Sequence, residues 1–584
     1  MSRIFPSIRQ LLHRFAAVKA AGSYTIVHLR PSRQRLAAVL LMIVTASAGL
    51  EAAVTDNRNF QISKQFDIFH SIYRELEAFY VDSTDVNKVF DGVLQGLLSS
   101  YDPYTEYIPQ DEMDDFKYLT TGGYAGIGAL IAQRNGHIEV SEPYEGMPAQ
   151  KAGVCFGDEI VSIDGEEMAG KDVSYASSKL RGEPNTEVRL VLRRQGEKKL
   201  LHKVLVRQLV QIDQVEYYGM VAPGIGYIYL SGFTDKASQE VRQALLSLQA
   251  QGADKLILDL RGNGGGVLSE AVNLCNLFLP KDQLILETRG RIPEWDHKYR
   301  TTREPLAPEM PLVVLVNSMS ASASEIVAGA IQDLDRGVVI GTRTFGKGLV
   351  QTTRELPYDA MIKLTTAKYY IPSGRCIQAI DYSNRNDDGS VGRIPDSLTC
   401  EFHTRAGRLV RDGGGVLPDV EISLPDYSSL TYELAVGEYI FDYANRYYAA
   451  HPKAQPIDEF RITDADYADF KAFVMEKGVK YDLSSRRQIE NLKTALEYDG
   501  YLDLVKDELS ALEQKLEKDL AHDLDYFRSD IEQLLLSELV SRYYFRRGEI
   551  QVSLRDDEFT RRAIGVLSDE TQYNSLLKPN KSEQ

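Results

Sequence analysis

The sequence predicts a multidomain protein of mixed α+β and α/β class. Helices at both ends are expected to enclose a small β-rich module and a larger core of alternating strands and helices. Three observations carry this prediction. Apolar residues recur at helical spacing in residues 56–116 and 427–584. Short strands separated by glycine turns occupy residues 119–208. Near-continuous apolar strands alternate with helices in residues 209–424, as in a parallel sheet that is covered on both faces.

The composition is that of an acidic globular protein. At about 150 residues per domain, 584 residues suffice for several hydrophobic cores. With 26% charged and 43% hydrophobic residues, the chain is neither wholly disordered nor a polytopic membrane protein. The formal net charge of -17, from 67 basic and 84 acidic residues, argues against nucleic acid as a partner, because phosphate contacts need clustered lysine and arginine.

The cysteines indicate neither a metal site nor a disulfide scaffold. They show no CxxC motif and no Cys/His spacing that would suit zinc. Whether Cys376 and Cys400 pair is left open by the sequence. The four cysteines are Cys155, Cys275, Cys376 and Cys400.

The first 52 residues predict an export signal or a membrane anchor. Residues 1–50 contain no Asp or Glu, and Arg30, Arg33 and Arg35 lead into the apolar run Leu36–Leu50, which has the length of a secretory apolar segment. Ala46-Ser47-Ala48 offers a cleavage site, but the long segment ahead of the run leaves an uncleaved anchor open. The alternative is a misassigned start followed by a buried helix. Export places the protein in the cell envelope, in a periplasmic or other extracytoplasmic compartment.

The two terminal helical regions are assigned no chemistry. Residues 56–116 predict two helices joined around Asp82–Asp85, followed by a turn at Tyr101–Tyr104, where Pro103 cannot continue a helix. Residues 427–584 predict a helical bundle or a pairing helix, because leucines recur at steps of three and four through residues 502–520. The apolar stripes of both regions predict a homo-oligomer.

The β-rich module resembles the PDZ domain of secreted bacterial proteases. The resemblance rests on the segments Pro148–Val154 and Gly157–Gly165. It implies that a peptide adds a strand to an open sheet edge and that its terminal carboxylate is bound by backbone N–H groups of a glycine loop. The alternative is a β module that packs against its neighbour without a ligand. The residues expected at the peptide site are Tyr124, Gly126, Ile127 and Gly128.

A candidate nucleophile follows the predicted strand at residues 311–316. The run Asn317–Ile326 consists mostly of small residues and stands where a strand meets a helix. Such a junction permits a sharp turn and leaves helix N-terminal N–H groups free to stabilise an anion. The alternative is that a serine, Ser320 or Ser324, simply caps the helix.

Two segments together resemble the C-terminal processing proteases of peptidase family S41. Ser-Ala-Ser-Glu contains Ser322, and Phe-Gly-Lys-Gly, which contains Lys347, follows 25 residues later; in the family these segments carry the nucleophile and the base. Gln351 matches the third member of the family triad. Ser318-Met319 departs from the usual glycine-containing lead-in. The resemblance covers roughly residues 60–420, and it implies a mechanism without a metal or an organic cofactor.

The chemistry requires a neutral lysine. A serine hydroxyl becomes a useful nucleophile only when an adjacent base accepts its proton. Lysine has an ordinary pKa of roughly 10.4, and burial has to lower this value toward about 7 to 8 for general-base catalysis near neutral pH. Apolar neighbours such as Phe345, Leu349 and Val350 are expected to bury Lys347, and Gln351 is expected to orient it without adding a charge.

The glycine loop 261–266, directly after the predicted strand Leu256–Leu260, is the expected source of oxyanion donors. The resemblance implies a backbone N–H from Gly264 or Gly265, paired with that of Ala323. Taken alone, such a loop is also typical of phosphate-binding turns at helix starts.

The sequence therefore predicts an exported serine endopeptidase that captures proteins or peptides by their C-termini. A nucleotide-binding P-loop is disfavoured because Gly348 stands where that motif needs Ser or Thr. A Ser-His-Asp hydrolase is disfavoured because no G-x-S-x-G motif is present. The alternative from another class is a catalytically silent, peptide-binding scaffold of the cell envelope.

Overall fold

The structure is a computed structural model, and it falls into two units, residues 1–94 and residues 95–584. The expected signal or anchor at residues 1–52 lies outside the described residues. In the part of the chain that is described, no helix is both long enough and apolar enough to cross a membrane. The described residues are 58–83, 85–383, 385–386, 389–423, 427–516 and 519–579.

The described part of the first unit consists of helices, as the apolar periodicity predicts. Residues 58–79 form one helix, which ends before residues 80–83, and α3 spans Val86–Ser99. The division between the two units falls within α3. Most large apolar side chains of this unit are exposed, among them Phe60, Phe66, Ile72, Leu76 and Phe79.

The β-rich module of the second unit is a sheet with the strand order β3-β4-β5-β7-β8, in which β3 is an edge strand. Helix α6 (Val173–Leu180) packs against β3 and β5, and Asp172 caps it by accepting a hydrogen bond from the Tyr175 N–H. A separate pair, β2 (Gly123–Gly126) and β9 (Gln208–Gln211), joins the two ends of the module. The bounds are β3 (Ala129–Arg134), β4 (His137–Pro143), α5 (Pro148–Lys151), β5 (Glu159–Ile163), β6 (Glu166–Glu167), β7 (Glu187–Arg193) and β8 (Leu201–Val206).

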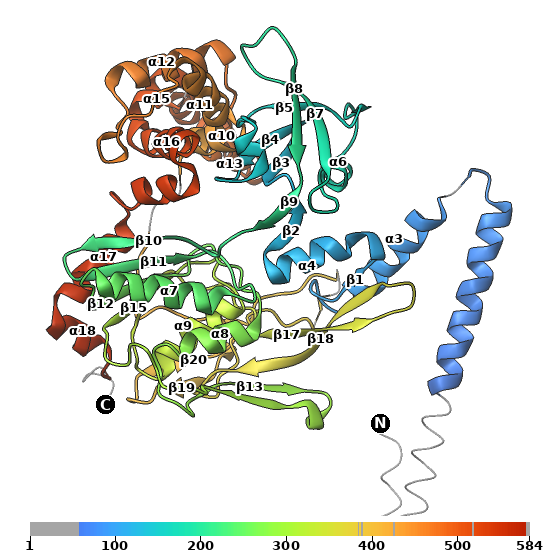
Figure 1. The fold of residues 1–584 in the computed structure, drawn as a ribbon, viewed down its shortest axis with the longest axis vertical. Coiled ribbons are helices and arrows are strands. Elements are labelled where there is room, and N and C mark those ends of the chain that lie inside the picture. Colours follow the sequence, from blue (N-terminus) through green and yellow to red (C-terminus); the bar gives the residue numbers. More distant parts are fainter. Residues whose placement is uncertain are drawn as a thin grey trace, which may run out of the picture. The chain divides into compact units, whose positions relative to one another are not determined.

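A six-stranded sheet forms the centre of the second unit (Figure 1). Its order is β10-β11-β12-β15-β16-β21, with β10 antiparallel to β11 and every other pair parallel. The predicted strands at Leu256–Leu260 and Leu312–Val316 are confirmed to within one residue. The bounds are β10 (Val215–Ala222), β11 (Ile225–Leu230), β12 (Lys255–Asp259), β15 (Leu312–Val316), β16 (Val338–Gly341) and β21 (Val420–Glu421).

Helices cover both faces of this sheet, because alternate residues of each strand point to opposite sides. Leu256 and Leu258 pack in the cluster that contains α7 (Ala237–Ala250), α8 (Leu268–Cys275) and α9 (Ala323–Asp333). Ile257 packs in a second cluster with residues of α17 (Glu558–Ser568) and with Tyr573 of α18 (Glu570–Leu576). The last two helices of the chain are therefore part of the core sandwich.

A second sheet lies beside the first and carries part of the candidate site. Its path is β1-β18-β13-β14, and β17 also pairs with β18. Strand β1 comes from the segment before the β-rich module and pairs antiparallel with β18. The bounds are β1 (Glu106–Ile108), β13 (Leu284–Gly290), β14 (His297–Arg300), β17 (Leu349–Glu355) and β18 (Met361–Tyr370).

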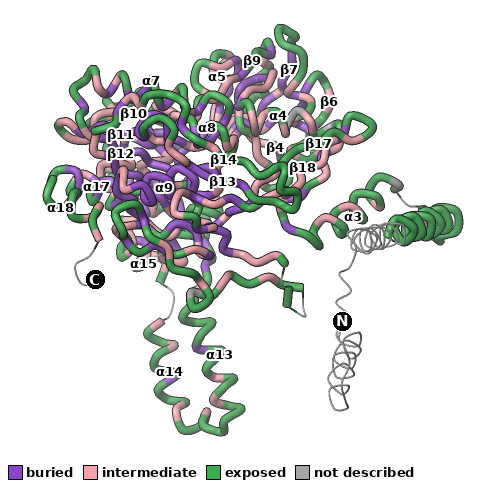
Figure 2. Tube along the Cα trace, turned by 90° about the horizontal axis from the view of Figure 1, so that it is seen from below, coloured by how far each residue is buried: buried purple, intermediate pink, exposed green. Residues whose placement is uncertain are grey.

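The helices from α10 to α16 pack around their own apolar core, except for α13 and α14, which are mostly exposed (Figure 2). The leucine stripe at residues 502–520 is not one helix, and of its leucines only Leu509 is buried. Arg134 of β3 links the β-rich module to these helices through an ion pair with Glu438 at 3.2 Å and a contact with the Phe441 ring at 3.6 Å. The bounds are α10 (Ser429–Val436), α11 (Tyr439–Ala450), α12 (Asp464–Lys477), α13 (Ser484–Asp499), α14 (Lys506–Lys515), α15 (Leu520–Tyr526) and α16 (Arg528–Ser553).

Candidate active site

Ser322 stands at the sharp turn between β15 and α9. It is the N-cap residue of α9, with φ 55° and ψ -112°, a conformation that costs a non-glycine residue free energy. Neither Ser320 nor Ser324 caps the helix. Instead, the Ser320 hydroxyl donates to the Leu260 carbonyl at 2.8 Å, and the Ser324 hydroxyl donates to the Asn263 carbonyl at 2.9 Å. These two serines hold the turn against the glycine loop.

A buried carboxylate connects this turn to the loop that carries Lys347. One oxygen of Glu325 accepts hydrogen bonds from the backbone N–H groups of Ser322 and Lys347, both at 2.8 Å. The other oxygen accepts from the Gly346 N–H at 2.7 Å and from the Thr344 hydroxyl at 2.6 Å. Burial raises the pKa of the Glu325 carboxyl, and these four donors oppose that effect. Glu325 thereby fixes the backbones of residues 322 and 347 next to each other.

A second side chain makes the same connection through carbonyl groups. The hydroxyl of Tyr369, in β18, lies 2.7 Å from the carbonyl oxygen of Lys347 and 3.1 Å from that of Ser322. Tyr369 is only 1% exposed, and burial raises its pKa well above the ordinary value, so the hydroxyl keeps its proton and remains a donor. The two backbones are thus bridged on both their N–H and their carbonyl groups.

The side chain of Lys347 lies against an aromatic ring. Its Nζ atom is 4.2 Å from the ring centroid of Tyr104, whose other neighbour is Tyr382, in an edge-to-face contact with centroids 6.1 Å apart. Burial lowers the pKa of Lys347, and the nearby charge of Lys363 lowers it further. Within the described chain, Nζ makes no hydrogen bond to Ser322 or to Gln351. The structure therefore brings the backbones of Ser322 and Lys347 together, while the amine of Lys347 contacts the Tyr104 ring.

Gln351 lies on β17, and its amide nitrogen donates to the Thr365 hydroxyl at 3.1 Å. Thr365 belongs to the facing strand β18, where it is the register partner of Gln351. The structure thus places Gln351 near the base along the chain, but its side chain is engaged with β18.

The glycine loop after β12 packs directly against the turn at Ser322. The loop conformation brings Gly265 so close that a Cβ atom there would lie 2.8 Å from the Ser322 Cβ, and its φ of 97° also favours glycine. The Gly265 N–H donates to the Asn263 side chain at 2.9 Å and is therefore engaged. The N–H groups of Gly264 and Ala323 have no hydrogen-bond partner among the described residues. Of the expected oxyanion donors, these two are available.

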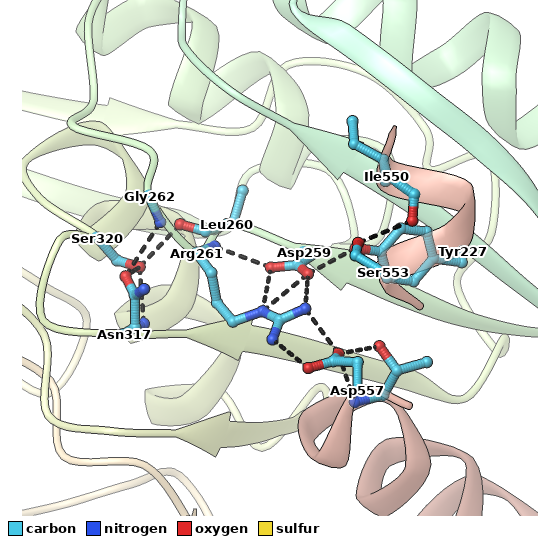
Figure 3. A network of polar contacts seen from close by, with 11 residues as sticks. Tyr227, Asp259, Leu260, Arg261, Gly262, Asn317, Ser320, Ile550, Ser553 and Asp557 are labelled. Carbon is cyan, nitrogen blue, oxygen red and sulfur yellow. Dashed lines mark hydrogen bonds and ion pairs between the residues drawn. The ribbon is translucent and has the colours of Figure 1, made fainter. Parts of the chain in front are cut away.

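The start of the glycine loop is fixed by a network of charges (Figure 3). Arg261 pairs with Asp259 at the end of β12, and Asp259 also accepts a hydrogen bond from the Tyr227 hydroxyl at 2.6 Å. The Gly262 N–H donates to the Asn317 side chain at 3.0 Å, and Asn317 directly follows β15. The loop is therefore held by groups from three neighbouring strands of the sheet.

A narrow cavity of about 160 Å³ lies between β3 and α6 in the β-rich module. Tyr124 lines it, and Tyr118 meets Tyr124 edge to face with ring centroids 5.3 Å apart. Burial raises the pKa of Tyr124 to about 12, and the backbone N–H groups of Ala129 and Gly128 oppose this shift. The expected loop thus borders the cavity: Gly126 ends β2, the side chain of Ile127 is 2% exposed, and Gly128 has a φ of 72°. The lining residues are Tyr118, Tyr124, Ile127, Ala129, Leu130, Ile131, Tyr144, Val173, Ser177, Leu180 and Arg181.

Reasoning from the sequence assigned no role to Glu325, Tyr369 or Tyr104. A signal for Glu325 was present, because Ser322-Ala-Ser-Glu325 has the S-x-x-E spacing of a capping box, in which the glutamate accepts from the backbone of the N-cap residue. Tyr369 and Tyr104 reach the site only through the pairing of distant strands. The stretch that begins at Tyr369 is similar to one that follows the lysine in family members, but this similarity assigned Tyr369 no role.

Three family models match the chain. The model described as "Peptidase family S41" matches residues 224–383. The model described as "PDZ domain" matches residues 139–194, within the β-rich module. The model described as "Probable PDZ-protease, C-terminal helical domain" matches residues 430–567.

Individual proteins with similar sequences bear related names. The chain is 37% identical over 332 residues to the carboxy-terminal-processing protease of Bartonella bacilliformis, which covers 56% of this chain and 76% of that protein. It is 31% identical over 407 residues to the carboxy-terminal processing protease CtpA of Bacillus subtilis, which covers 68% of this chain and 78% of that protein. Among solved structures, the photosystem II D1 C-terminal processing protease is 27% identical and matches 61% of this chain and 92% of its own, with a TM-score of 0.33.

Glu325→Gln is expected to lower the free energy of unfolding by about 3 kcal/mol, because a glutamine amide turns an N–H donor toward groups that are themselves donors. Urea denaturation of the full chain measures the change. Glu309→Gln, at an exposed position, is the control and is expected to leave the unfolding midpoint unchanged. An equal midpoint for the two variants would contradict the bridging role of Glu325.

Tyr104→Leu is expected to give Lys347 a lower pKa than Tyr104→Phe does. The ring attracts only the ammonium form, so its loss disfavours the protonated state, whereas phenylalanine keeps an aromatic face. The pH dependence of the Lys347 ¹³Cε chemical shift, assigned with Lys347→Arg, measures this pKa. The same pKa in both variants would show that the ring does not hold the charge.

Proposed function

Since the chain belongs to peptidase family S41 and contains a PDZ domain, we propose that it is a C-terminal processing protease in which Ser322 is the nucleophile and Lys347 is the general base. The observation that carries this proposal is the double bridge from Glu325 and Tyr369, which holds the two backbones together in a buried site. The strained φ of Ser322 adds support, because such conformations recur at catalytic residues.

The reaction proceeds through an acyl-enzyme. Neutral Lys347 accepts the hydroxyl proton of Ser322 while the serine oxygen attacks the scissile carbonyl carbon. The N–H groups of Gly264 and Ala323 donate to the oxyanion that forms. Lys347 then gives its proton to the leaving amine as the peptide bond breaks. Water, activated by the lysine, hydrolyses the ester and restores Ser322.

In this proposal the amine of Lys347 leaves the ring of Tyr104 when it loses its proton. The attraction to the ring is electrostatic and acts on the ammonium, so deprotonation frees Nζ to turn toward Ser322. Gln351 then orients the neutral amine from its position on β17. The contact of Nζ with the Tyr104 ring and its contact with Ser322 therefore exclude each other, and pH determines which of the two forms.

Substrates are proteins or peptides captured by their C-termini. Strand β3 is a sheet edge beside α6, so an extended peptide can add to it as a further strand. The loop from Tyr124 to Gly128 stands at one end of this edge and offers backbone N–H groups to the terminal carboxylate. The walls of the cavity are largely apolar, which favours an apolar terminal side chain.

The location and assembly of the protein are also part of the proposal. The apolar run Leu36–Leu50 supports export to the cell envelope, either as a cleaved signal or as an anchor. The exposed apolar side chains of the helix at residues 58–79 support self-association.

Ser322→Ala and Lys347→Ala are each expected to abolish cleavage of an unstructured protein by the full chain. The rate of the unsubstituted protein is expected to rise with pH and to reach half its maximum below pH 10.5, the ordinary pKa of lysine, because burial lowers the pKa of Lys347. Mass spectrometry of the fragments at a series of pH values measures both effects.

A rate that stays constant from acid to alkaline pH would contradict the role of Lys347. Binding of peptides with free C-termini, without cleavage under any of these conditions, would favour the silent scaffold instead.

Ser177→Trp is expected to weaken the binding of a peptide with a free apolar C-terminus by about tenfold or more, because the indole fills the cavity between β3 and α6. Ser178→Trp, on the exposed side of the same helix, is the matched control. Fluorescence anisotropy of a labelled peptide, with its C-terminally amidated form for comparison, measures the affinity. Equal affinity for both variants would place the peptide elsewhere.

A further inference from the structure

We propose that Asp557 is a positioning residue of the active site, which fixes Arg261 and thereby the glycine loop that carries the Gly264 N–H. This inference deepens the proposed function and rests on it. Asp557 precedes α17, far along the chain from the segments that supply the serine and the lysine. The structure thus assigns part of the oxyanion machinery to the C-terminal helices.

The contact between Asp557 and Arg261 is bidentate. The two carboxylate oxygens accept from Nη1 and Nη2 of Arg261, each at 2.8 Å (Figure 3). Nε and Nη2 of the same guanidinium also face the carboxylate of Asp259. The guanidinium is planar, and carboxylates bind along two of its edges, so its orientation is fixed. The Phe559 ring, 4.8 Å from the guanidinium carbon, adds a contact from α17.

All three charged groups are removed from water. Side-chain exposure is 19% for Arg261, 1% for Asp259 and 16% for Asp557. Burial by itself would raise the pKa of Asp557, but Arg261 more than offsets this effect, and the pKa lies below its ordinary value. Asp557 therefore stays ionised, and the bidentate pair persists at neutral and moderately acid pH.

Arg261 is the first residue of the glycine loop, and Gly264 lies only a few residues further along. The position of Arg261 therefore affects the position of the candidate oxyanion donor. Its own backbone N–H donates to Asp259 at 2.9 Å, and the next residue, Gly262, donates to Asn317. Asn263 is anchored through its side chain to the Leu230 carbonyl at 2.9 Å. Gly264 follows, and it has no side chain that could anchor it. The placement of its N–H depends on how firmly the residues on both sides of it are held: Gly265 follows, with its carbonyl accepting from the Phe233 N–H at 3.0 Å, and Arg261 and Asn263 hold the side that leads into it.

Asp557 can play this part because α17 is itself fixed to the sheet. Phe559, Ala563 and Val566 are buried in the cluster that covers the second face of the sheet. Asp557 also caps α17 by accepting from the Thr560 N–H at 3.0 Å. One carboxylate therefore joins the start of this helix to the start of the glycine loop. It touches neither the serine nor the lysine, so its effect on the reaction passes through Arg261.

The test compares Asp557→Asn with Asp569→Asn in the full chain. Asp569 is a matched control, because it caps α18 by accepting from the Gln572 N–H at 3.0 Å and pairs with no arginine in the described part of the chain. Asparagine is a good N-cap residue, so both variants keep their caps. Asp557→Asn also leaves Arg261 paired with Asp259, and no buried charge is left alone.

For Asp557→Asn, kcat on a peptide substrate is expected to fall about 10- to 100-fold, because a small displacement of an oxyanion donor is costly to the transition state. KM is expected to stay within about twofold, because the proposed role of the Gly264 N–H is to donate to the oxyanion, which forms only in the transition state. Backbone hydrogen exchange of residues 260–266 is expected to accelerate. Asp569→Asn is expected to change none of these quantities, and Asp557→Glu is expected to recover part of kcat.

An unchanged kcat for Asp557→Asn in an active enzyme would overturn the proposal, and so would a loss that appears only in KM. Equal losses in Asp557→Asn and Asp569→Asn would also overturn it, because they would show a general effect of helix capping. If the unsubstituted chain cleaves nothing, the proposed function fails separately. The exchange measurement needs no substrate, and unchanged exchange of residues 260–266 would then refute the link between Asp557 and the loop.

Discussion

A single buried carboxylate holds the candidate active site together. Glu325 accepts four hydrogen bonds, and they come from two segments that the chain separates by a helix and a strand. A carboxylate removed from water is stable only when its oxygens are saturated with donors, so the site cannot form unless both segments are in place. The strained turn at Ser322 is maintained by the same bonds. Geometry and stability therefore depend on one side chain.

The sequence predicted the parts of the fold that follow from local patterns. The strand ending at Asp259 and the strand before Ser322 were placed to within one residue, because apolar runs bounded by glycine and small residues are unambiguous in a parallel sheet. The candidate site was predicted from two short motifs. Tyr104 and Asp557 were not found, because they arrive through a strand pairing and a helix packing that join distant segments.

Two more detailed expectations, about an oxyanion donor and about a leucine-rich stretch, were modified by contacts that the sequence does not reveal. Gly265 was one of the two glycines expected to supply an oxyanion donor beside Ala323, but its N–H is engaged by Asn263, an interaction that a glycine-rich sequence does not reveal. The leucines of residues 502–520 predicted a helical bundle or a pairing helix by their spacing. In the described residues this stretch consists of short helices, and only Leu509 of its leucines is buried, so the leucine spacing does not mark a continuous buried face.

Helices α17 and α18 cover one face of the central sheet, and this affects the order in which the protein can fold. Strand β16 ends at Gly341, whereas the helices that bury its outer face begin at Glu558. During synthesis, one apolar face of the sheet stays uncovered until α17 and α18, which leave the ribosome much later, can pack against it. Contacts between such distant segments slow folding and expose a nascent chain to aggregation. If Asp557 positions Arg261 as we propose, the same delay leaves the glycine loop of a half-made chain without one of its supports.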